Sequence, residues 1–136
     1  MLQLKFTVLT NEEIADKVFK MTLAGDTTDI KCGQFVNIQI EGAYLRRPIS
    51  VCDVEKDLLT IIYKVVGKGT EIMSELPLGT TLDVLTGLGN GYDTSKSGDK
   101  PLLIGGGVGV PPMYLLAKEL IGLGKEVTVI LGFNTK

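Results

Sequence analysis

A run of glycines near the end of the chain has the residue types and spacing of a phosphate-binding turn. Residues 105–109 read Gly-Gly-Gly-Val-Gly and stand between a short apolar run and a segment with helical spacing. Backbone N–H groups of such a turn, together with the helix N-terminus, can face a phosphate. The full G-x-G-x-x-G fingerprint of dinucleotide sites is absent, because a frame that starts at Gly105 has Val110 in its last glycine position. Phe133 and Asn134 also stand where an acidic residue would hold a ribose. The turn therefore predicts either a nucleotide site or close packing of a strand on a helix.

A second candidate is the segment Leu45-Arg46-Arg47-Pro48-Ile49-Ser50. An arginine side chain can make two parallel hydrogen bonds to a phosphate, and a serine two residues beyond a proline can present its hydroxyl. In an extended strand Pro48 and Ser50 share one face, with Arg47 and Ile49 on the other. Taken alone, the segment is more typical of an ordinary strand start with solvated arginines.

Two further segments could contribute to the same kind of site. Tyr63 and Lys64 lie in the stretch 61–67, where they could line a ligand. A tyrosine on a barrel strand is nevertheless usually part of the core, and a lysine is usually solvated. Residues 69–76 fit a short helix with Thr70 as its N-cap and Glu71 in the first turn. The N–H groups at the start of this helix could hold a pyrophosphate, although a simple helix cap is the commoner role for such residues.

Short strands are expected to position these segments in the first part of the chain. Polar and apolar residues alternate along several stretches, which is the pattern of antiparallel strands with one buried face. Short strands separated by turn residues favour a small closed barrel, here a six-stranded antiparallel Greek-key barrel. The strands are predicted at residues 2–8, 19–23, 36–40, 47–53, 58–66 and 81–85.

The last part of the chain is expected to form a strand, a helix and a second strand. Apolar side chains recur at helical spacing from Met113 to Ile121, and the two prolines before them suit a first helical turn. Residues 101–104 and 127–131 are nearly continuous apolar runs, as in a parallel sheet that is covered on both faces. So small a unit cannot bury its own apolar faces, so the chain is expected to be part of a longer protein or to be covered by a partner.

These two patterns predict two domains. Residues 1–98 would form the barrel domain and residues 99–136 an incomplete α/β domain, with the glycine-rich loop 85–101 leading from one to the other.

The composition excludes several kinds of chemistry within these 136 residues. The chain has no histidine, which rules out a Ser-His-Asp triad or a histidine base. Its two cysteines, Cys32 and Cys52, are too few for a four-cysteine metal site and are expected to be buried free thiols. Any redox chemistry must therefore be carried by an organic cofactor.

Charge and hydropathy predict a cytoplasmic protein. A net charge of −2 argues against nucleic-acid binding, which needs a basic surface. No apolar run approaches the roughly 18 residues needed to span a bilayer. The first residues alternate in polarity and do not have the layout of a signal peptide.

The order and spacing of these motifs resemble those of the ferredoxin–NADP reductase superfamily. An Arg-Pro-Ile-Ser segment, a barrel strand, a Gly-Lys-Gly-Thr helix start, a Leu-Gly-Asn-Gly loop and a Gly-Gly-Gly-Val-Gly-Val-Pro-Pro turn follow one another along the chain. Within that superfamily the Arg-Arg-Pro-Ile-Ser start, the double proline and the Ile-Leu-Gly-Phe ending are most similar to the electron-transfer subunits of dihydroorotate dehydrogenases. The resemblance covers the whole chain and ends before the iron–sulfur segment of that family.

The resemblance implies a barrel that binds FAD and a following α/β domain that binds NAD(H). Arg47 would lie near the pyrophosphate of FAD and Ser50 near its reactive ring, while Gly69 and Thr70 would offer the pyrophosphate backbone and hydroxyl donors. It implies no catalytic side chain and no metal ligand in these residues. The cofactor-binding residues that it implies are Arg47, Pro48, Ile49, Ser50, Ile62, Tyr63, Lys64, Gly69, Thr70, Gly105, Gly106, Gly107 and Gly109.

The activity implied by the resemblance is electron relay in an oxidoreductase. FAD can accept a hydride and release electrons singly, so it can connect the NAD(H) couple to a [2Fe-2S] centre. In the family, C-terminal cysteines hold that centre, so these residues alone are expected to be inactive. The partner would be an FMN-containing catalytic subunit that oxidises dihydroorotate to orotate in pyrimidine biosynthesis, and the assembly a heterotetramer.

Two alternatives stay open at this point. The chain could belong to the small subunit of an NADH-dependent ferredoxin:NADP oxidoreductase, which shares the barrel and the glycine turn. It could also be a non-catalytic barrel that docks to a partner without flavin.

Overall fold

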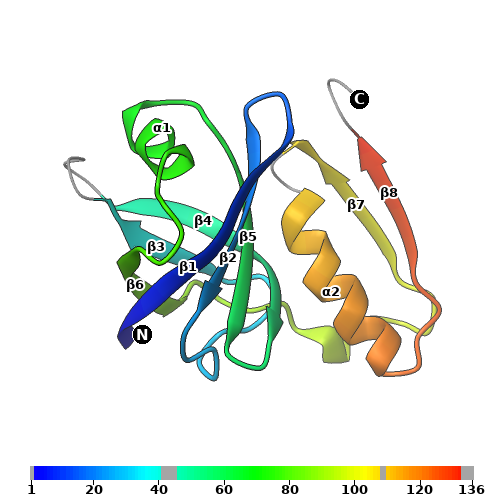
Figure 1. The fold of residues 1–136 in the computed structure, drawn as a ribbon. Coiled ribbons are helices and arrows are strands. Elements are labelled where there is room, and N and C mark those ends of the chain that lie inside the picture. The colour runs from blue at the N-terminus through cyan, green and yellow to red at the C-terminus, as the bar shows by residue number, and fades with distance from the viewer. Residues whose placement is uncertain (1, 41–45, 108–109, 133–136) are drawn as a thin grey trace.

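The computed structural model describes residues 2–40, 46–107 and 110–132, and it places a barrel beside a smaller α/β unit (Figure 1). The described elements of the barrel unit are β1 (Leu2–Ala15), β2 (Val18–Ala24), β3 (Phe35–Gln39), β4 (Arg47–Glu55), β5 (Leu58–Lys64), α1 (Lys68–Ser74) and β6 (Thr81–Leu88). After the 3-10 turn η1 (Thr94–Lys96), the smaller unit consists of β7 (Leu102–Gly106), α2 (Val110–Gly122) and β8 (Thr128–Gly132).

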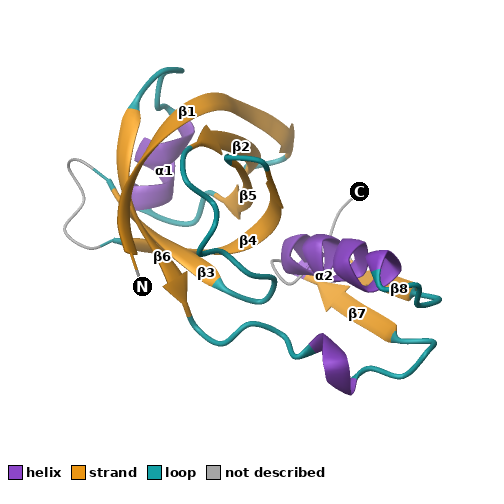
Figure 2. Cartoon of the chain, turned by 90° about the horizontal axis from the view of Figure 1, so that it is seen from below, coloured by secondary structure: helices purple, strands orange, loops and turns teal. Residues whose placement is uncertain are grey.

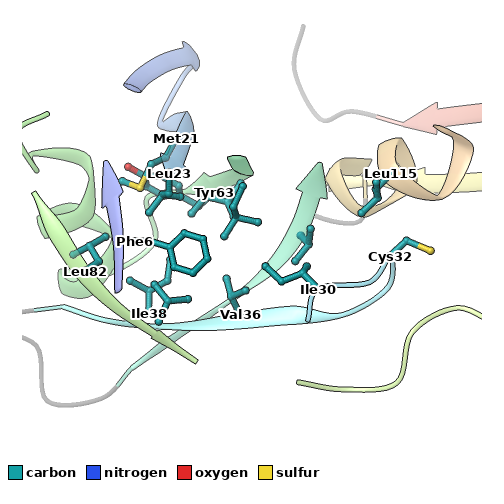
Figure 3. Packing of buried hydrophobic residues seen from close by; sticks show 14 of the residues in the cluster. Phe6, Met21, Leu23, Ile30, Cys32, Val36, Ile38, Tyr63, Leu82 and Leu115 are labelled. Carbon is teal, nitrogen blue, oxygen red and sulfur yellow. The ribbon is translucent and has the colours of Figure 1, made fainter. Parts of the chain in front are cut away.

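The strands of the first unit close into an antiparallel barrel in the order β1-β2-β5-β4-β3-β6 (Figure 2). The barrel forms because alternate residues of each strand point inward, as the burial of Phe6 and Val8 on β1 illustrates. Figure 3 shows Phe6 in the middle of this core, among side chains that include Ile38 and Leu82. The predicted six-stranded antiparallel barrel is therefore confirmed.

The short helix α1 closes one end of the barrel (Figure 2). Its side chain Met73 is fully buried and belongs to the barrel core, while Gly69 and Thr70 are buried in its first turn. This packing fixes the start of α1 next to the strands β4 and β5.

Of the helices that the structure describes, none is long and apolar enough to cross a membrane.

The helix α2 lies between the barrel and the two-stranded sheet of the second unit (Figures 1 and 2). It contacts β4 on one side and β7 on the other, and Leu115, Leu116 and Leu120 are buried. Lys118 strengthens the contact with β4, because its Nζ lies 3.1 Å from Asp53 Oδ1 and 3.4 Å from Glu55 Oε1. The second unit is thus packed directly onto the barrel.

The strands β7 and β8 pair in parallel, as predicted, from Leu102 opposite Thr128 to Gly106 opposite Gly132. Within the described residues this sheet is not covered on both faces, as expected for a unit that is too small to bury its own apolar faces. Every residue of β8 is exposed, and Ile104 on β7 is 68% exposed. Of the described helices, α2 packs against β7 and β8.

Several element boundaries differ from the predicted ones. The first strand continues to Ala15 because residues 9–15 pair with β2 through two register irregularities, which hide the alternation that a regular strand would show. β6 extends to Leu88, so the loop begins later than predicted. β7 runs on through Gly105 and Gly106, which pair with β8 and do not belong to the turn.

Candidate functional site

A pocket of about 250 Å³ lies where β4, β5 and the start of α1 meet. Its walls bring together two strands and a helix start that are separated along the chain. Seven of its eight lining residues are among those predicted from the sequence, and the eighth is Val66. The lining consists of Pro48, Ile49, Ser50, Ile62, Tyr63, Lys64, Val66 and Thr70.

Val66 is the pocket residue that the sequence reasoning missed. The alternation that places Ile62 and Lys64 on one side of β5 also predicts Val66 for that side, since it is two residues further on. Val66 itself is 79% exposed. The side chain is therefore available to cover an apolar ligand at the rim of the pocket.

Arg47 lies beside this pocket, against the first turn of α1. A Cβ atom at Gly69 would collide with Nε and the guanidinium carbon of Arg47, so the glycine makes room for the arginine side chain. Within the described residues, Nε of Arg47 is buried without a hydrogen-bond partner. A buried donor of this kind is costly unless a ligand or solvent accepts its hydrogen bond.

The neighbouring Arg46, in contrast to Nε of Arg47, makes hydrogen bonds and an ion pair within the barrel. Its Nη1 donates to the carbonyl oxygen of Asp83 at 3.2 Å, and its Nη2 lies 3.4 Å from Oδ1 of Asp83 and 3.3 Å from the side-chain oxygen of Gln39. These contacts hold Arg46 against the β3–β6 part of the barrel. Of the two arginines, Arg47 is thus the one directed to the predicted phosphate region.

The prediction that Thr70 is the N-cap of its helix is wrong. Gly67 is the N-cap, and Thr70 occupies the third helical position, from which its hydroxyl reaches back. Its Oγ1 accepts hydrogen bonds from the backbone N–H of Val66 at 2.9 Å and of Gly67 at 3.2 Å, and it donates to the Gly67 carbonyl at 3.1 Å. Because glycine has no side chain to cap the helix, the threonine takes over this role. The hydroxyl that was expected to bond a pyrophosphate is engaged within the chain.

Tyr63 forms a rigid wall of the pocket. Its ring stacks on Phe19 with centroids 5.7 Å apart, and its hydroxyl donates to Oδ1 of Asn11 at 2.7 Å. Burial raises the pKa of Tyr63 to about 12, because desolvation disfavours the phenolate. Tyr63 therefore stays protonated at neutral pH. Lys64, by contrast, is exposed at the end of β5.

Gly105, Gly106 and Gly107, which the resemblance assigns to the nicotinamide nucleotide, are not among the residues that line this pocket. Gly105 and Gly106 belong to β7, and Gly107 follows with a φ of 55°, a conformation that favours glycine. A Cβ atom at Gly107 would meet no atom of the described residues within 4 Å, its chain neighbours aside. Gly109 lies outside the described residues, as do Phe133 and Asn134.

Both cysteines are buried free thiols, as expected. Cys32 Sγ donates to Oε2 of Glu119 on α2 at 3.1 Å, which links the barrel to the second unit. Desolvation, and then Glu119, raises the pKa of Cys32 to about 12, and desolvation raises that of Cys52 to about 11. Among the described residues, no group of three or more Cys, Asp or Glu side chains is arranged to hold a metal ion.

Curated proteins that are similar in sequence to this chain share one name. A dihydroorotate dehydrogenase B (NAD(+)) electron transfer subunit from Bacillus pumilus is 47% identical over 96% of this chain and 54% of its own length. The subunit of the same name from Streptococcus mutans is 45% identical, over 96% of this chain and 53% of its own length. The chain thus spans about half the length of the curated relatives it matches. No protein-family model matches it.

Solved structures agree on the fold. An NADH-dependent reduced ferredoxin-NADP oxidoreductase superposes with a TM-score of 0.87 and 34% identity, over 96% of this chain and 49% of that chain. The closed antiparallel barrel followed by a parallel α/β unit is therefore the ferredoxin-reductase fold.

Proposed function

We infer that this chain, which is homologous to the electron-transfer subunits of dihydroorotate dehydrogenase B over nearly all of its length, forms the FAD-binding part of an oxidoreductase subunit. The observation that carries this proposal is the pocket in which Pro48–Ser50, β5 and the start of α1 meet. These are also the segments that the resemblance to the ferredoxin–NADP reductase superfamily assigns to FAD.

The residues present fit the two chemically different parts of FAD. Ile49, Ile62 and Tyr63 supply apolar and aromatic surface suited to the flavin ring. Arg47 supplies a cation beside the first turn of α1, with a buried Nε that lacks a partner among the described residues. A pyrophosphate would satisfy this donor, because arginine bonds phosphate oxygens with charge-assisted hydrogen bonds.

Bound FAD would supply the hydride and single-electron chemistry that no side chain of this chain provides. The role of the protein is then to bind and orient. We assign ring contacts to Pro48, Ile49, Ser50, Ile62 and Val66, and the pyrophosphate to Arg47 and the backbone of Gly69 and Thr70. Tyr63 acts as a wall and not as a proton donor, since its hydroxyl is held by Asn11 and its pKa is raised.

For the whole protein we propose electron transfer between NAD(H), FAD and a [2Fe-2S] centre in the oxidation of dihydroorotate. The relatives' names, which specify NAD(+) and an electron transfer subunit, support this step. We propose Gly105–Gly107 and Gly109 as part of the NAD(H) site, with the iron–sulfur centre held outside these 136 residues. An FMN-containing catalytic subunit would be the partner, in a cytoplasmic heterotetramer.

A second candidate function is favoured by the 34% identity to the NADH-dependent ferredoxin-NADP oxidoreductase. The two candidates predict different neighbouring genes. A pyrimidine-biosynthesis gene next to this one would support the dihydroorotate route, and a gene for a large glutamate-synthase-like partner would support the other.

The visible absorption spectrum of the purified chain, before and after addition of FAD and removal of the excess, tests flavin binding. We expect flavin bands that stay with the protein through gel filtration. A colourless protein whose melting temperature does not rise with FAD would contradict the proposal and favour the non-catalytic docking barrel.

A further inference from the structure

The side chain of Asn11 connects three elements around the pocket. Its Oδ1 accepts a hydrogen bond from the hydroxyl of Tyr63 on β5 at 2.7 Å, and its Nδ2 donates to the backbone carbonyl of Met73 on α1 at 2.8 Å. Because a carbonyl can only accept, the amide nitrogen must face Met73, and the amide oxygen is left for the phenol. The donor and the acceptor of each bond are thus determined. Tyr63 lies 52 positions and Met73 lies 62 positions after Asn11 in the sequence.

These two bonds hold opposite parts of the proposed flavin site. Tyr63 lines the pocket, and its ring stacks on that of Phe19. Met73 is fully buried at the end of α1, a helix of seven residues whose first turn carries Gly69 and Thr70. Met73 lies one helical turn after Thr70, so a bond at its carbonyl also bears on the position of the first turn.

We propose that Asn11 is a positioning residue that fixes the start of α1, and with it the pyrophosphate end of the site, relative to the ring-binding wall at Tyr63. This inference rests on the proposed function of the pocket. It predicts that Asn11 matters more for FAD, which spans both parts of the site, than for riboflavin, which has no pyrophosphate.

Asn11→Asp separates the two bonds. A carboxylate still accepts from Tyr63 but repels the Met73 carbonyl instead of donating to it, so the link to α1 is lost and the link to Tyr63 is kept. Asn11→Ala removes both bonds without adding a charge and serves if the aspartate variant does not fold. Thr10→Val is the matched control, because it removes the 2.6 Å contact between the hydroxyls of Thr10 and Thr22 one residue away on the same strand.

The first measurement is hydrogen exchange of α1 in the chain without flavin. We expect the amides of Glu71 and Glu75, which are hydrogen-bonded to Gly67 and Ile72, to exchange about tenfold faster in both Asn11 variants. Thr10→Val should leave them unchanged. Wild-type exchange of α1 in folded Asn11→Asp or Asn11→Ala would overturn the inference, whether or not the chain binds flavin.

The second measurement compares dissociation constants for FAD and riboflavin. Loss of the Asn11 link should weaken FAD binding by about tenfold and riboflavin binding much less. Equal losses for both flavins, or an equal loss in Thr10→Val, would show a general effect on stability and contradict a positioning role. If the wild-type chain bound neither flavin, the proposed function would fail, and the exchange measurement would still decide whether Asn11 positions α1.

Discussion

Two adjacent arginines have opposite surroundings, and this contrast makes the flavin site testable at the scale of single residues. Arg46 is bonded to Asp83 and Gln39, whereas Nε of Arg47 is buried without a partner among the described residues. We expect Arg47→Ala to raise the dissociation constant for FAD by roughly ten- to a hundredfold. This is the change expected when one charge-assisted hydrogen bond to phosphate is lost. A titration followed by flavin fluorescence measures the change.

Arg46→Ala is the control for this titration. It removes the same side chain one position away, and with it a partly exposed ion pair that stabilises the fold only slightly. Its affinity for FAD should stay within about threefold of that of the wild type, since Arg46 faces β6 and not α1. Similar losses in both variants would mean that Arg47 acts through general charge and not through a specific contact.

The sequence could identify most pocket residues but could not rank them. The resemblance to the ferredoxin–NADP reductase superfamily identified the segments 48–50 and 62–64, whereas alternation did not, because both segments line the pocket with consecutive residues. No local pattern shows that Asn11 meets Tyr63, because that contact joins positions far apart in the chain. The capping of α1 by Thr70 is local, but glycine has no side chain that could cap a helix, so the sequence favours Thr70 as the N-cap where the structure has Gly67.

At the scale of elements, the start of α1 depends on one hydroxyl. Thr70 Oγ1 makes three hydrogen bonds with the backbone of Val66 and Gly67. Thr70→Val keeps the shape of the side chain and removes all three, so the free energy of unfolding should fall by about 1–2 kcal/mol. Urea denaturation followed by circular dichroism measures this loss.

Thr70→Ser keeps the hydroxyl and should recover most of that stability. If Thr70→Ser were as unstable as Thr70→Val, the lost methyl group and not the hydrogen bonds would be responsible. FAD affinity should follow the same order, because the first turn of α1 borders the pocket.

Whether a segment forms a strand or a helix was predictable, because the periodicity that decides it is local. The ends of the elements were not predictable wherever contacts with distant segments set them. β1 is extended by pairing with β2, and the predicted turn residues Gly105 and Gly106 became strand by pairing with β8. The division into domains at residues 98 and 99 stays a prediction.

At the scale of the whole molecule, two buried thiols and a buried phenol predict that the stability of the fold falls at alkaline pH. Burial raises the pKa of Cys32 and Tyr63 to about 12 and that of Cys52 to about 11, from ordinary values of 9.0 for the thiols and 10.0 for the phenol. The unfolded chain therefore loses these protons at lower pH than the folded chain does. Their contribution to stability is complete below pH 9 and is lost as the pH rises from 9 towards 12.

Urea denaturation at pH 8 and at pH 10.5 measures this effect. Each group can lower the free energy of unfolding by at most about 1.4 kcal/mol per pH unit within its window. Cys52→Ala should reduce the slope of the free energy of unfolding against pH, since it removes one of the three groups. A free energy of unfolding that is the same at both pH values would contradict the buried, protonated state of these side chains.

Hydrogen–deuterium exchange of the chain with and without FAD tests the central claim most directly, because it reports both binding and its location. The account predicts that FAD slows exchange in residues 47–50 and 62–70, around the pocket, and leaves residues 2–6 of β1 unchanged. Protection confined to another part of the barrel, or none at all at saturating FAD, would contradict the assignment of this pocket as the flavin site.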